Sequence, residues 1–518
     1  MAASSAKASS PLSAKMPCEN HHKKVPSGLL VVFLIALAGL APGLSLAQGL
    51  NNLWMGGVEG ENPQPFGGTD LNFIAGELAV SYINRDIDFS RTSATITNAA
   101  GELLFSTNGT YVANATGDTM LNGAGLNPGP YSTQYPNGLH IAQGVLILPK
   151  PDHASDYYLF HCTVDDLPTA TAHRLYLTEV DMTLDGGLGG VVLKNQVILE
   201  DTLTAGKIAA VRHANGRDWW IFCHQANSTL FYRFLVTPQG VSTPMFQEIG
   251  VVRVLDAGQV CFSPDGSRFA YYWSETDLDI FDFDRCSGLL SNHVHVPISD
   301  GERGGGVAFS PNGQLLYVSS DIDAYQFNLT AADIAGSMVH IAEWDTFYSP
   351  FPPFATLFDL AQLAPDGKIY ISTANSTKHL HVINDPDVPG MDCNMVQHQL
   401  ELPSYFANSL PNHPNYHLGA LVGSPCDTLG LSVPEHPPPI HLSAYPNPSD
   451  GRFTLSYAAQ PSAGVLEVRD VSGKLVRQER IPAWSTVHTA DMHEQDVGLY
   501  QCTIRWGLRS SCARVVLE

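Results

Sequence analysis

The sequence predicts an all-β protein in which a repeated, multi-stranded unit precedes a small C-terminal β-sandwich. Strand–turn–strand patterns recur through most of the chain, and residues 444–518 carry an alternating strand pattern of their own. Long helical periodicity is hard to find. A hydrophobic content of 44% with 15% charged residues is typical of folded globular proteins. At 518 residues the chain is long enough for two or three domains.

The first segment, residues 1–47, has the pattern of a secretory signal peptide. Two lysines precede an apolar run at 29–40, and small residues lead to an A-x-A-like cleavage site between Ala47 and Gln48. Pro42 interrupts the apolar run, whereas a membrane-spanning helix needs about twenty predominantly apolar residues. We therefore expect an exported protein without a transmembrane anchor.

Residues 48–433 contain a weak internal repeat. Its clearest copies are residues 261–272, 308–318 and 361–371, each a strand, a Pro-Asp-Gly or Pro-Asn-Gly turn and a second strand. Proline presets such a turn, and glycine takes the positive φ that it requires. We expect equivalent hairpins at these three turns, whose glycines are Gly266, Gly313 and Gly367.

Turns roughly fifty residues apart suit the four-stranded blade of a β-propeller. One blade cannot bury both of its faces, so the repeats must stack around an axis. Fainter copies upstream bring the visible number to six, and residues 53–82 with the segment after Leu380 could close a seventh blade. Residues 48–433 are thus expected to form a propeller of six to seven blades, similar to the WD40-like propellers of secreted bacterial proteins. An array of β-sandwiches is the structural alternative.

A proline-rich spacer, residues 434–443, separates this body from the C-terminal module, because three consecutive prolines favour a stiff, extended chain. The module, residues 444–518, opens with a proline-rich turn and continues with short strands divided by glycine turns. Its distinctive residues are Tyr445, Pro446, Asn447, Pro448, Gly451, Phe453, Gly473, Gly498 and Tyr500.

The order of these residues resembles the type A C-terminal sorting domain of the type IX secretion system of Bacteroidetes. The resemblance implies an Ig-like β-sandwich that carries the protein through the outer membrane by way of the type IX machinery. It also implies removal of the domain while the cargo is attached to surface lipopolysaccharide. The expected location is therefore extracellular, or at the outer-membrane surface. A small adhesive module without a sorting role is the alternative.

The net charge argues against nucleic-acid binding, and the cysteines offer two candidate disulfides. A formal net charge of −23 repels nucleic acid, and no basic patch with interleaved aromatic residues is present. An exported chain can form disulfides. Cys502 and Cys512 lie on neighbouring predicted strands and could pair, and Cys393 with Cys426 is a second candidate.

Metal ligands have two weak candidates. Asp277, Asp279, Asp282 and Asp284 crowd one predicted strand, and oxygen ligands at this density could hold Ca²⁺. A solvated strand edge, where charge opposes edge-to-edge pairing, is the simpler explanation of these aspartates. His293 and His295 share one strand face and could chelate a metal, but the sequence identifies no third ligand. No cofactor is expected, apart from this calcium candidate.

The sequence shows no strong catalytic motif, since H-E-x-x-H, G-x-S-x-G and the phosphate-binding P-loop are all absent. Aromatic clusters such as Trp219–Trp220 and residues 271–273 are expected to be mostly core, with the remainder available as a carbohydrate or peptide platform. We therefore expect a secreted propeller that binds a glycan or protein ligand. A propeller-based glycan or peptide hydrolase or lyase is the alternative. An aromatic, charge-poor axial face would favour binding, and a cluster of carboxylates and histidines there would favour an enzyme.

Overall fold

The computed structural model describes residues 49–518 except 61, 74–77, 255–257, 299–303, 351–352, 428–440 and 508. The predicted signal peptide and most of the predicted spacer lie outside these residues. The described residues are almost entirely β-structure. Helical turns are confined to α1 (Pro130–Gln134) and the short segments Asp185–Gly187, Ala335–Ser337 and Gly390–Cys393. None of these helices is long or apolar enough to cross a membrane.

The first half of the described body consists of four groups of antiparallel strands. The first three groups, blades 1 to 3, are β1 (Leu53–Val58), β2 (Gly67–Asn72) and β3 (Ala79–Ile83); β4 (Ala94–Thr97), β5 (Leu103–Thr107), β6 (Tyr111–Asn114) and β7 (Thr119–Ala124); and β8 (Val145–Pro149), β9 (Asp156–His161), β10 (Thr171–Asp181) and β11 (Gly190–Thr204). Blade 4 consists of β12 (Ala209–Arg212), β13 (Trp219–His224), β14 (Ser228–Thr237), β15 (Gly240–Val241) and β16 (Met245–Arg253). A parallel pairing between Leu121 and Gly190 joins the outer strands of blades 2 and 3.

The second half repeats one four-stranded pattern three times. Blades 5 to 7 are β17 (Gln259–Phe262), β18 (Arg268–Trp273), β19 (Asp277–Asp284) and β20 (Leu289–Val296); β21 (Gly306–Phe309), β22 (Leu315–Ser320), β23 (Asp323–Asn328) and β24 (Val339–Glu343); and β27 (Phe358–Leu363), β28 (Ile369–Thr373), β29 (Ser376–Ile383) and β30 (Met395–Ala407). A small hairpin, β25 (Tyr348–Ser349) and β26 (Phe354–Ala355), lies between blades 6 and 7 in the chain.

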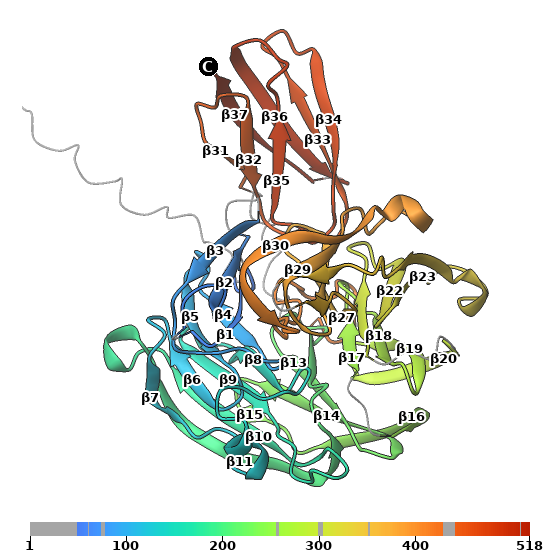
Figure 1. The fold of residues 1–518 in the computed structure, drawn as a ribbon. Coiled ribbons are helices and arrows are strands. Elements are labelled where there is room, and N and C mark those ends of the chain that lie inside the picture. Colours follow the sequence, from blue (N-terminus) through green and yellow to red (C-terminus); the bar gives the residue numbers. More distant parts are fainter. Residues whose placement is uncertain are drawn as a thin grey trace, which may run out of the picture. The chain divides into compact units, whose positions relative to one another are not determined.

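The three repeat turns occupy equivalent positions, as predicted. Gly266, Gly313 and Gly367 each lie in the hairpin between the first and second strands of their blade, with φ of 71°, 66° and 81°. Successive blades follow one another in chain order, from blue β1 through green β14 to orange β29 (Figure 1). The described residues of the body, from β1 to β30, therefore form a seven-bladed propeller with one three-stranded blade, at the upper end of the predicted six to seven.

Hydrophobic clusters fill each boundary between neighbouring blades, and the ring closes between blade 7 and blade 1. There, Trp54 packs against Tyr370 of β28, with ring centroids 5.8 Å apart. A side chain at Gly56 would place its Cβ 2.0 Å from the ring of Phe406 on β30. Glycine at position 56 thus lets the first blade approach the last, so that both faces of each are buried.

The C-terminal module is a two-layered β-sandwich. One layer contains β31 (Ser443–Tyr445), β32 (Arg452–Ser456) and β35 (Val487–Asp491), and the other contains β33 (Gly464–Arg469), β34 (Leu475–Ile481), β36 (Gly498–Trp506) and β37 (Arg509–Leu517). Phe453, Leu466 and Ile504 are buried in its hydrophobic core.

The predicted disulfide between Cys502 and Cys512 is wrong. Antiparallel pairing places Cys502 opposite Ala513 and Cys512 opposite Thr503, one position out of register. Because successive side chains of a strand point to opposite faces, Cys502 is buried in the core while Cys512 is exposed. Both thiols are free.

Candidate functional site

After β30 the chain crosses one end of the ring as a strap, residues 409–427. Pro411 and Pro414 have no backbone N–H, so this segment cannot join a sheet ladder, and polar side chains supply its bonds instead. The Asn412 amide donates to Val145 O and Ile208 O, at 3.0 and 2.8 Å. These carbonyls belong to blade 3 and to the segment entering blade 4, so one asparagine ties two blades together.

Further along, the strap contacts β8 a second time and also reaches blade 5. The Tyr416 hydroxyl donates to Ile147 O at 2.8 Å, and the Asn415 amide donates to Pro264 O at 2.7 Å, immediately after β17 of blade 5. The polar groups of the strap are therefore satisfied largely by backbone carbonyls in or beside the inner strands β8, β12 and β17, and these contacts keep it over the axis.

The end of the strap is fastened covalently to blade 5. Cys426 forms a disulfide with Cys286, with a Cα–Cα distance of 5.5 Å. The predicted pairing of Cys426 with Cys393 is wrong, because Cys393 is buried in the core between blades 6 and 7 as a free thiol. Beside the disulfide, the Arg285 guanidinium donates to Arg212 O at 2.8 Å and also to Gly419 O.

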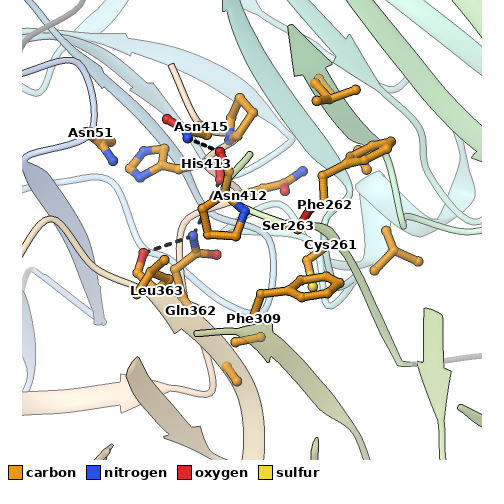
Figure 2. A pocket seen from close by; sticks show the side chains of 18 of the residues that line it. Asn51, Cys261, Phe262, Ser263, Phe309, Gln362, Leu363, Asn412, His413 and Asn415 are labelled. Atoms are coloured by element: carbon orange, nitrogen blue, oxygen red, sulfur yellow. Dashed lines mark hydrogen bonds between the residues drawn. The ribbon is translucent and has the colours of Figure 1, made fainter. Parts of the chain in front are cut away.

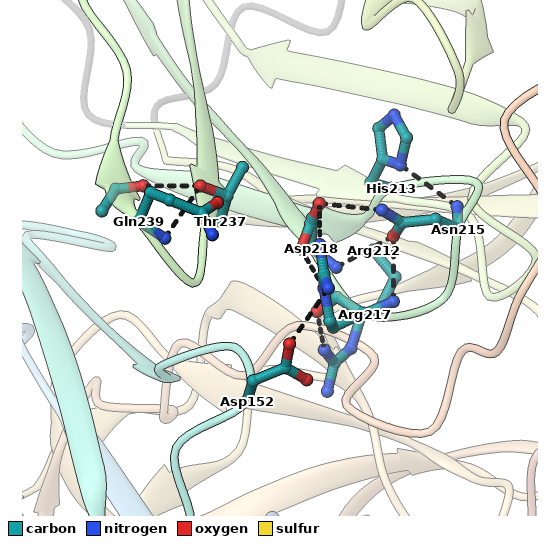
Figure 3. Close-up of polar contacts among 9 residues, drawn as sticks. Asp152, Arg212, His213, Asn215, Arg217, Asp218, Thr237 and Gln239 are labelled. Carbon is teal, nitrogen blue, oxygen red and sulfur yellow. Dashed lines mark hydrogen bonds and ion pairs between the residues drawn. The ribbon is translucent and has the colours of Figure 1, made fainter. Parts of the chain in front are cut away.

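Charged side chains gather in the neighbouring turn between β12 and β13, shown in Figure 3. Arg217 Nε lies 2.7 Å from Asp218 Oδ1, and Asn215 Nδ2 donates to Asp218 Oδ2 at 2.8 Å. Arg217 also reaches Asp152 of the preceding blade at 3.0 Å. The guanidinium of Arg212 lies 3.8 Å over the ring of Trp219. These charges pair with one another and with the scaffold, and they lie outside the axial pocket described next.

The strap and the ends of the inner strands β12, β17, β21 and β27 enclose an axial pocket of about 110 Å³. Figure 2 shows the side chains that project toward it. The ones that matter chemically are Asn51, Phe262, Phe309, Gln362, His413 and His417. They come from the segment before β1, from the ends of β17 and β21, from β27 and from the strap.

The axial pocket is electrically neutral. None of its lining residues that the structure describes is Asp, Glu, Lys or Arg. Burial lowers the pKa of His413 to about 4 and that of His417 to about 4, so both imidazoles are uncharged at pH 7. His413 Nε2 lies 2.9 Å from Thr95 O and donates to it, which leaves Nδ1 as a hydrogen-bond acceptor.

Two amide side chains of the axial pocket are weakly held. Gln362 Nε2 contacts only Leu363 O and His413 O, both at the long distance of 3.4 Å, and Asn51 Oδ1 lies 3.2 Å from His417 Nε2. Gln143 differs, because it exchanges bonds of 2.9 and 2.8 Å with the backbone of Val260. Gln143 is therefore part of the scaffold, whereas Gln362 can turn to a ligand at little cost.

The four aspartates predicted as calcium ligands do not converge. Asp282 accepts from the Asn292 amide at 2.8 Å, and Asp284 caps the turn that leads to Cys286. Only Asp279 lies within reach of both His293 and His295. Strand alternation separates Asp277 and Asp279, which both lie near His295, from Asp282 and Asp284.

The predicted sorting motif is built around the last strand of the chain. The Asn447 side chain accepts from Val516 N at 3.0 Å and donates to Arg514 O at 2.8 Å. Ser449 N donates to Val516 O at 2.9 Å. Tyr445 is 76% exposed, whereas Phe453 is buried. The motif thus holds β37 in place and leaves an aromatic ring in solvent. Gly451 and Gly473 have positive φ, Gly498 leads into β36, and the Tyr500 hydroxyl donates to Asp496 O.

Comparison with known proteins identifies the family of the C-terminal module. Residues 443–518 match the family described as the secretion system C-terminal sorting domain. No curated protein sequence matches the chain. Among solved structures, the chain is similar to a candidate 6-phosphogluconolactonase from Bacteroides fragilis, with 12% identity, coverage of 71% of this chain and 98% of that one, and a TM-score of 0.40.

Two other similar structures have the same low level of identity. A candidate 6-phosphogluconolactonase from Bacteroides uniformis is 13% identical, with coverage of 68% and 98% and a TM-score of 0.41. The Dos1 propeller is 11% identical, with coverage of 63% and 91% and a TM-score of 0.34. The C-terminal module, with its Tyr-Pro-Asn-Pro turn, is a type IX secretion sorting domain, and the protein is a β-propeller that this domain directs to the cell surface or the extracellular space.

Proposed function

We propose that the secreted propeller is a binding module whose ligand enters the axial pocket. The observation that carries this proposal is the neutrality of the pocket, which combines two phenylalanine rings with amide and imidazole groups and has no charged side chain among its described residues. Hydrolysis and lyase chemistry call for a positioned acid, base or nucleophile. Binding requires only shape, apolar surface and a few polar groups, which this pocket offers.

The ligand class that fits is a neutral, hydroxyl-rich group such as one sugar residue of a glycan. The rings of Phe262 and Phe309 offer apolar surface for the C–H face of a sugar. The amides of Gln362 and Asn51 can each donate and accept hydrogen bonds. An ionic ligand would lose its hydration without a counter-charge, so we expect it to be rejected.

The location of the protein supports an extracellular ligand. A sorting domain implies contact with the type IX secretion machinery. Attachment of the mature propeller to surface lipopolysaccharide is part of this proposal. It would present the axial pocket to glycans or proteins outside the cell.

The test is a glycan array followed by calorimetry with the purified chain. We expect neutral saccharides to bind and acidic ones to fail. Gln362→Leu keeps the side-chain volume but removes the polar groups, and we expect it to weaken binding about tenfold, as losing one or two hydrogen bonds does. Gln239→Leu, on an exposed hairpin of blade 4, is the matched control. Equal affinity for the two variants would place the ligand elsewhere.

The alternative, a glycan or peptide hydrolase or lyase, has one observation in its favour, on the segments that lead into the inner strands β4 and β8. Ser90 Oγ lies 2.6 Å from His140 Nδ1. Burial, followed by the nearby charge of Arg91, lowers the pKa of His140, which keeps it available as a base. A fluorophosphonate probe that labels the protein, but not Ser90→Ala, would support this alternative. No labelling would leave the pair as an ordinary hydrogen bond.

A further inference from the structure

A second polar cluster lies on the outer part of blade 5, away from the residues that line the axial pocket. Three side chains meet there: Asp279 from β19, and His293 and His295 from β20. The two histidines are two positions apart, so both point to one face of their strand. Antiparallel pairing places His295 directly opposite Asp279. The histidine pair is visible in the sequence, whereas the third side chain, Asp279, is identified by the pairing of β19 with β20.

The three groups converge on one oxygen atom. His293 Nε2 lies 2.8 Å from Asp279 Oδ1, and His295 Nδ1 lies 2.9 Å from the same oxygen. All three candidate ligand atoms lie within 4.8 Å of one another. The carboxylate is 2% exposed, while the imidazoles are 23% and 33% exposed. One side of the cluster is therefore buried and the other is accessible from solvent.

We propose that Asp279, His293 and His295 bind a divalent transition metal of the Zn²⁺, Ni²⁺ or Cu²⁺ class. Two imidazole nitrogens and one carboxylate oxygen are ligands that these metals prefer, and three protein ligands leave coordination positions open to water or to a further ligand. Ca²⁺ takes six to eight oxygen ligands, which this cluster lacks. The proposal thus replaces the calcium hypothesis with a different metal class and a different ligand set.

Each ligand is already oriented by a neighbour. Asp277 Oδ2 lies 3.4 Å from His295 Nε2, so a second carboxylate faces the ring nitrogen other than the one that faces Asp279. Arg253 Nη2 lies 2.6 Å from Asp279 Oδ2 and holds the carboxylate by the oxygen that faces away from the histidines. The ring of His293 stacks on Phe281, with centroids 4.9 Å apart. Such orienting contacts are typical of built metal sites.

The charges around the cluster are compatible with a cation. Asp279 and Arg253 neutralise one another, and Asp277, whose side chain is 28% exposed, supplies a further negative charge beside His295. A bound metal would take the place of the imidazole protons that now point at Asp279 Oδ1.

The test is calorimetric titration of the purified full chain with ZnCl₂ and NiCl₂, after chelation and without a polyhistidine tag. We expect one metal per chain, with no heat from CaCl₂. Replacing bound metal by Co²⁺ should give a visible absorption band characteristic of imidazole ligation. Asp277→Asn should weaken binding about 10- to 100-fold, since it removes only the orienting carboxylate.

Variants of the two histidines distinguish a metal-binding site from a cluster that is held only by hydrogen bonds. His293→Ala and His295→Ala should each abolish the stoichiometric binding. His340→Ala is the matched control, because His340 lies 2.6 Å from Asp323 on the third and fourth strands of the next blade, where only one histidine is paired with the aspartate. Unchanged binding in both blade 5 variants, or no binding to the parent chain at micromolar metal, would overturn the proposal.

Discussion

The disulfide between Cys286 and Cys426 gives the most quantitative prediction. The two cysteines are 140 residues apart, so the bond closes a long loop of the unfolded chain. Loop-closure entropy for this separation corresponds to about 5 kcal/mol, and measured disulfides typically contribute about 2 to 4 kcal/mol. We therefore expect Cys426→Ser to lower the free energy of unfolding by about 3 to 5 kcal/mol.

The same loss can be expressed as a shift in melting temperature. The unfolding entropy of a propeller that spans residues 49–427, roughly 380 residues, is about 0.8 kcal/mol per kelvin. A loss of 3 to 5 kcal/mol then lowers the melting temperature by about 4 to 6 °C. Asn412, Asn415 and Tyr416 keep the rest of the strap bonded to the inner strands, so we expect the folded state to persist.

Differential scanning calorimetry of the parent chain, Cys426→Ser and Cys286→Ser measures this shift, and a non-reducing peptide map identifies the bond. Both variants should melt at the same lower temperature, and added reductant should bring the parent to that temperature. Cys512→Ser removes an exposed free thiol and is the control expected to melt like the parent. If the variants melted with the parent, or if the map showed Cys286 and Cys426 unpaired, the reasoning would be refuted.

Three further predictions follow from the described residues. Gly266→Ala should destabilise the propeller by about 1 to 3 kcal/mol more than Gly313→Ala in denaturant titrations. Both glycines have positive φ, but a Cβ at position 266 would lie 2.8 Å from Val211, and at 313 it would meet nothing within 4 Å; equal losses would contradict this. Burial lowers the pKa of His161 and of His381 to about 3, so both are neutral when folded. The stability of the folded state with these two neutral histidines is complete above the unfolded histidine pKa of about 6.5 and is lost as the pH falls toward 3. The melting temperature should therefore drop over that pH range. A melting temperature that stays constant there would contradict the buried, neutral histidines. Deleting residues 443–518 should strand the propeller in the periplasm, and fusing 434–518 to an exported reporter should bring it to the surface, as protease treatment of intact cells can show; surface display of the truncated chain would contradict a sorting role.

The repeat and the sorting motif could be predicted from the sequence because their information is local. Pro-Asp-Gly turns such as the one at Gly266 specify a hairpin within a few residues. The Tyr-Pro-Asn-Pro segment is likewise a local turn signal. The blade count was left open because blade 1 has only three strands, and its closure depends on the contact of Gly56 with Phe406, far apart in the chain.

The axial pocket and the disulfide could not be predicted, because both depend on long-range contacts. Two prolines and several polar residues in 411–417 indicate a segment that bonds through side chains, but they do not show which strands it crosses. Cysteine pairing depends on which turn the strap reaches, and spacing alone favoured Cys393 over Cys286. The meeting of a carboxylate with the histidine pair also depends on long-range contacts, since strand register decides which aspartate lies opposite His295.

Equilibrium dialysis with a neutral saccharide that the array identifies, followed by mass spectrometry of the ligand, tests the central claim most directly. A binding protein should retain one saccharide per chain and release it chemically unchanged after prolonged incubation. Gln362→Leu should retain less, in proportion to its weaker affinity. Recovery of a hydrolysed or eliminated product that increases with time would contradict a binding role and establish an enzyme in its place.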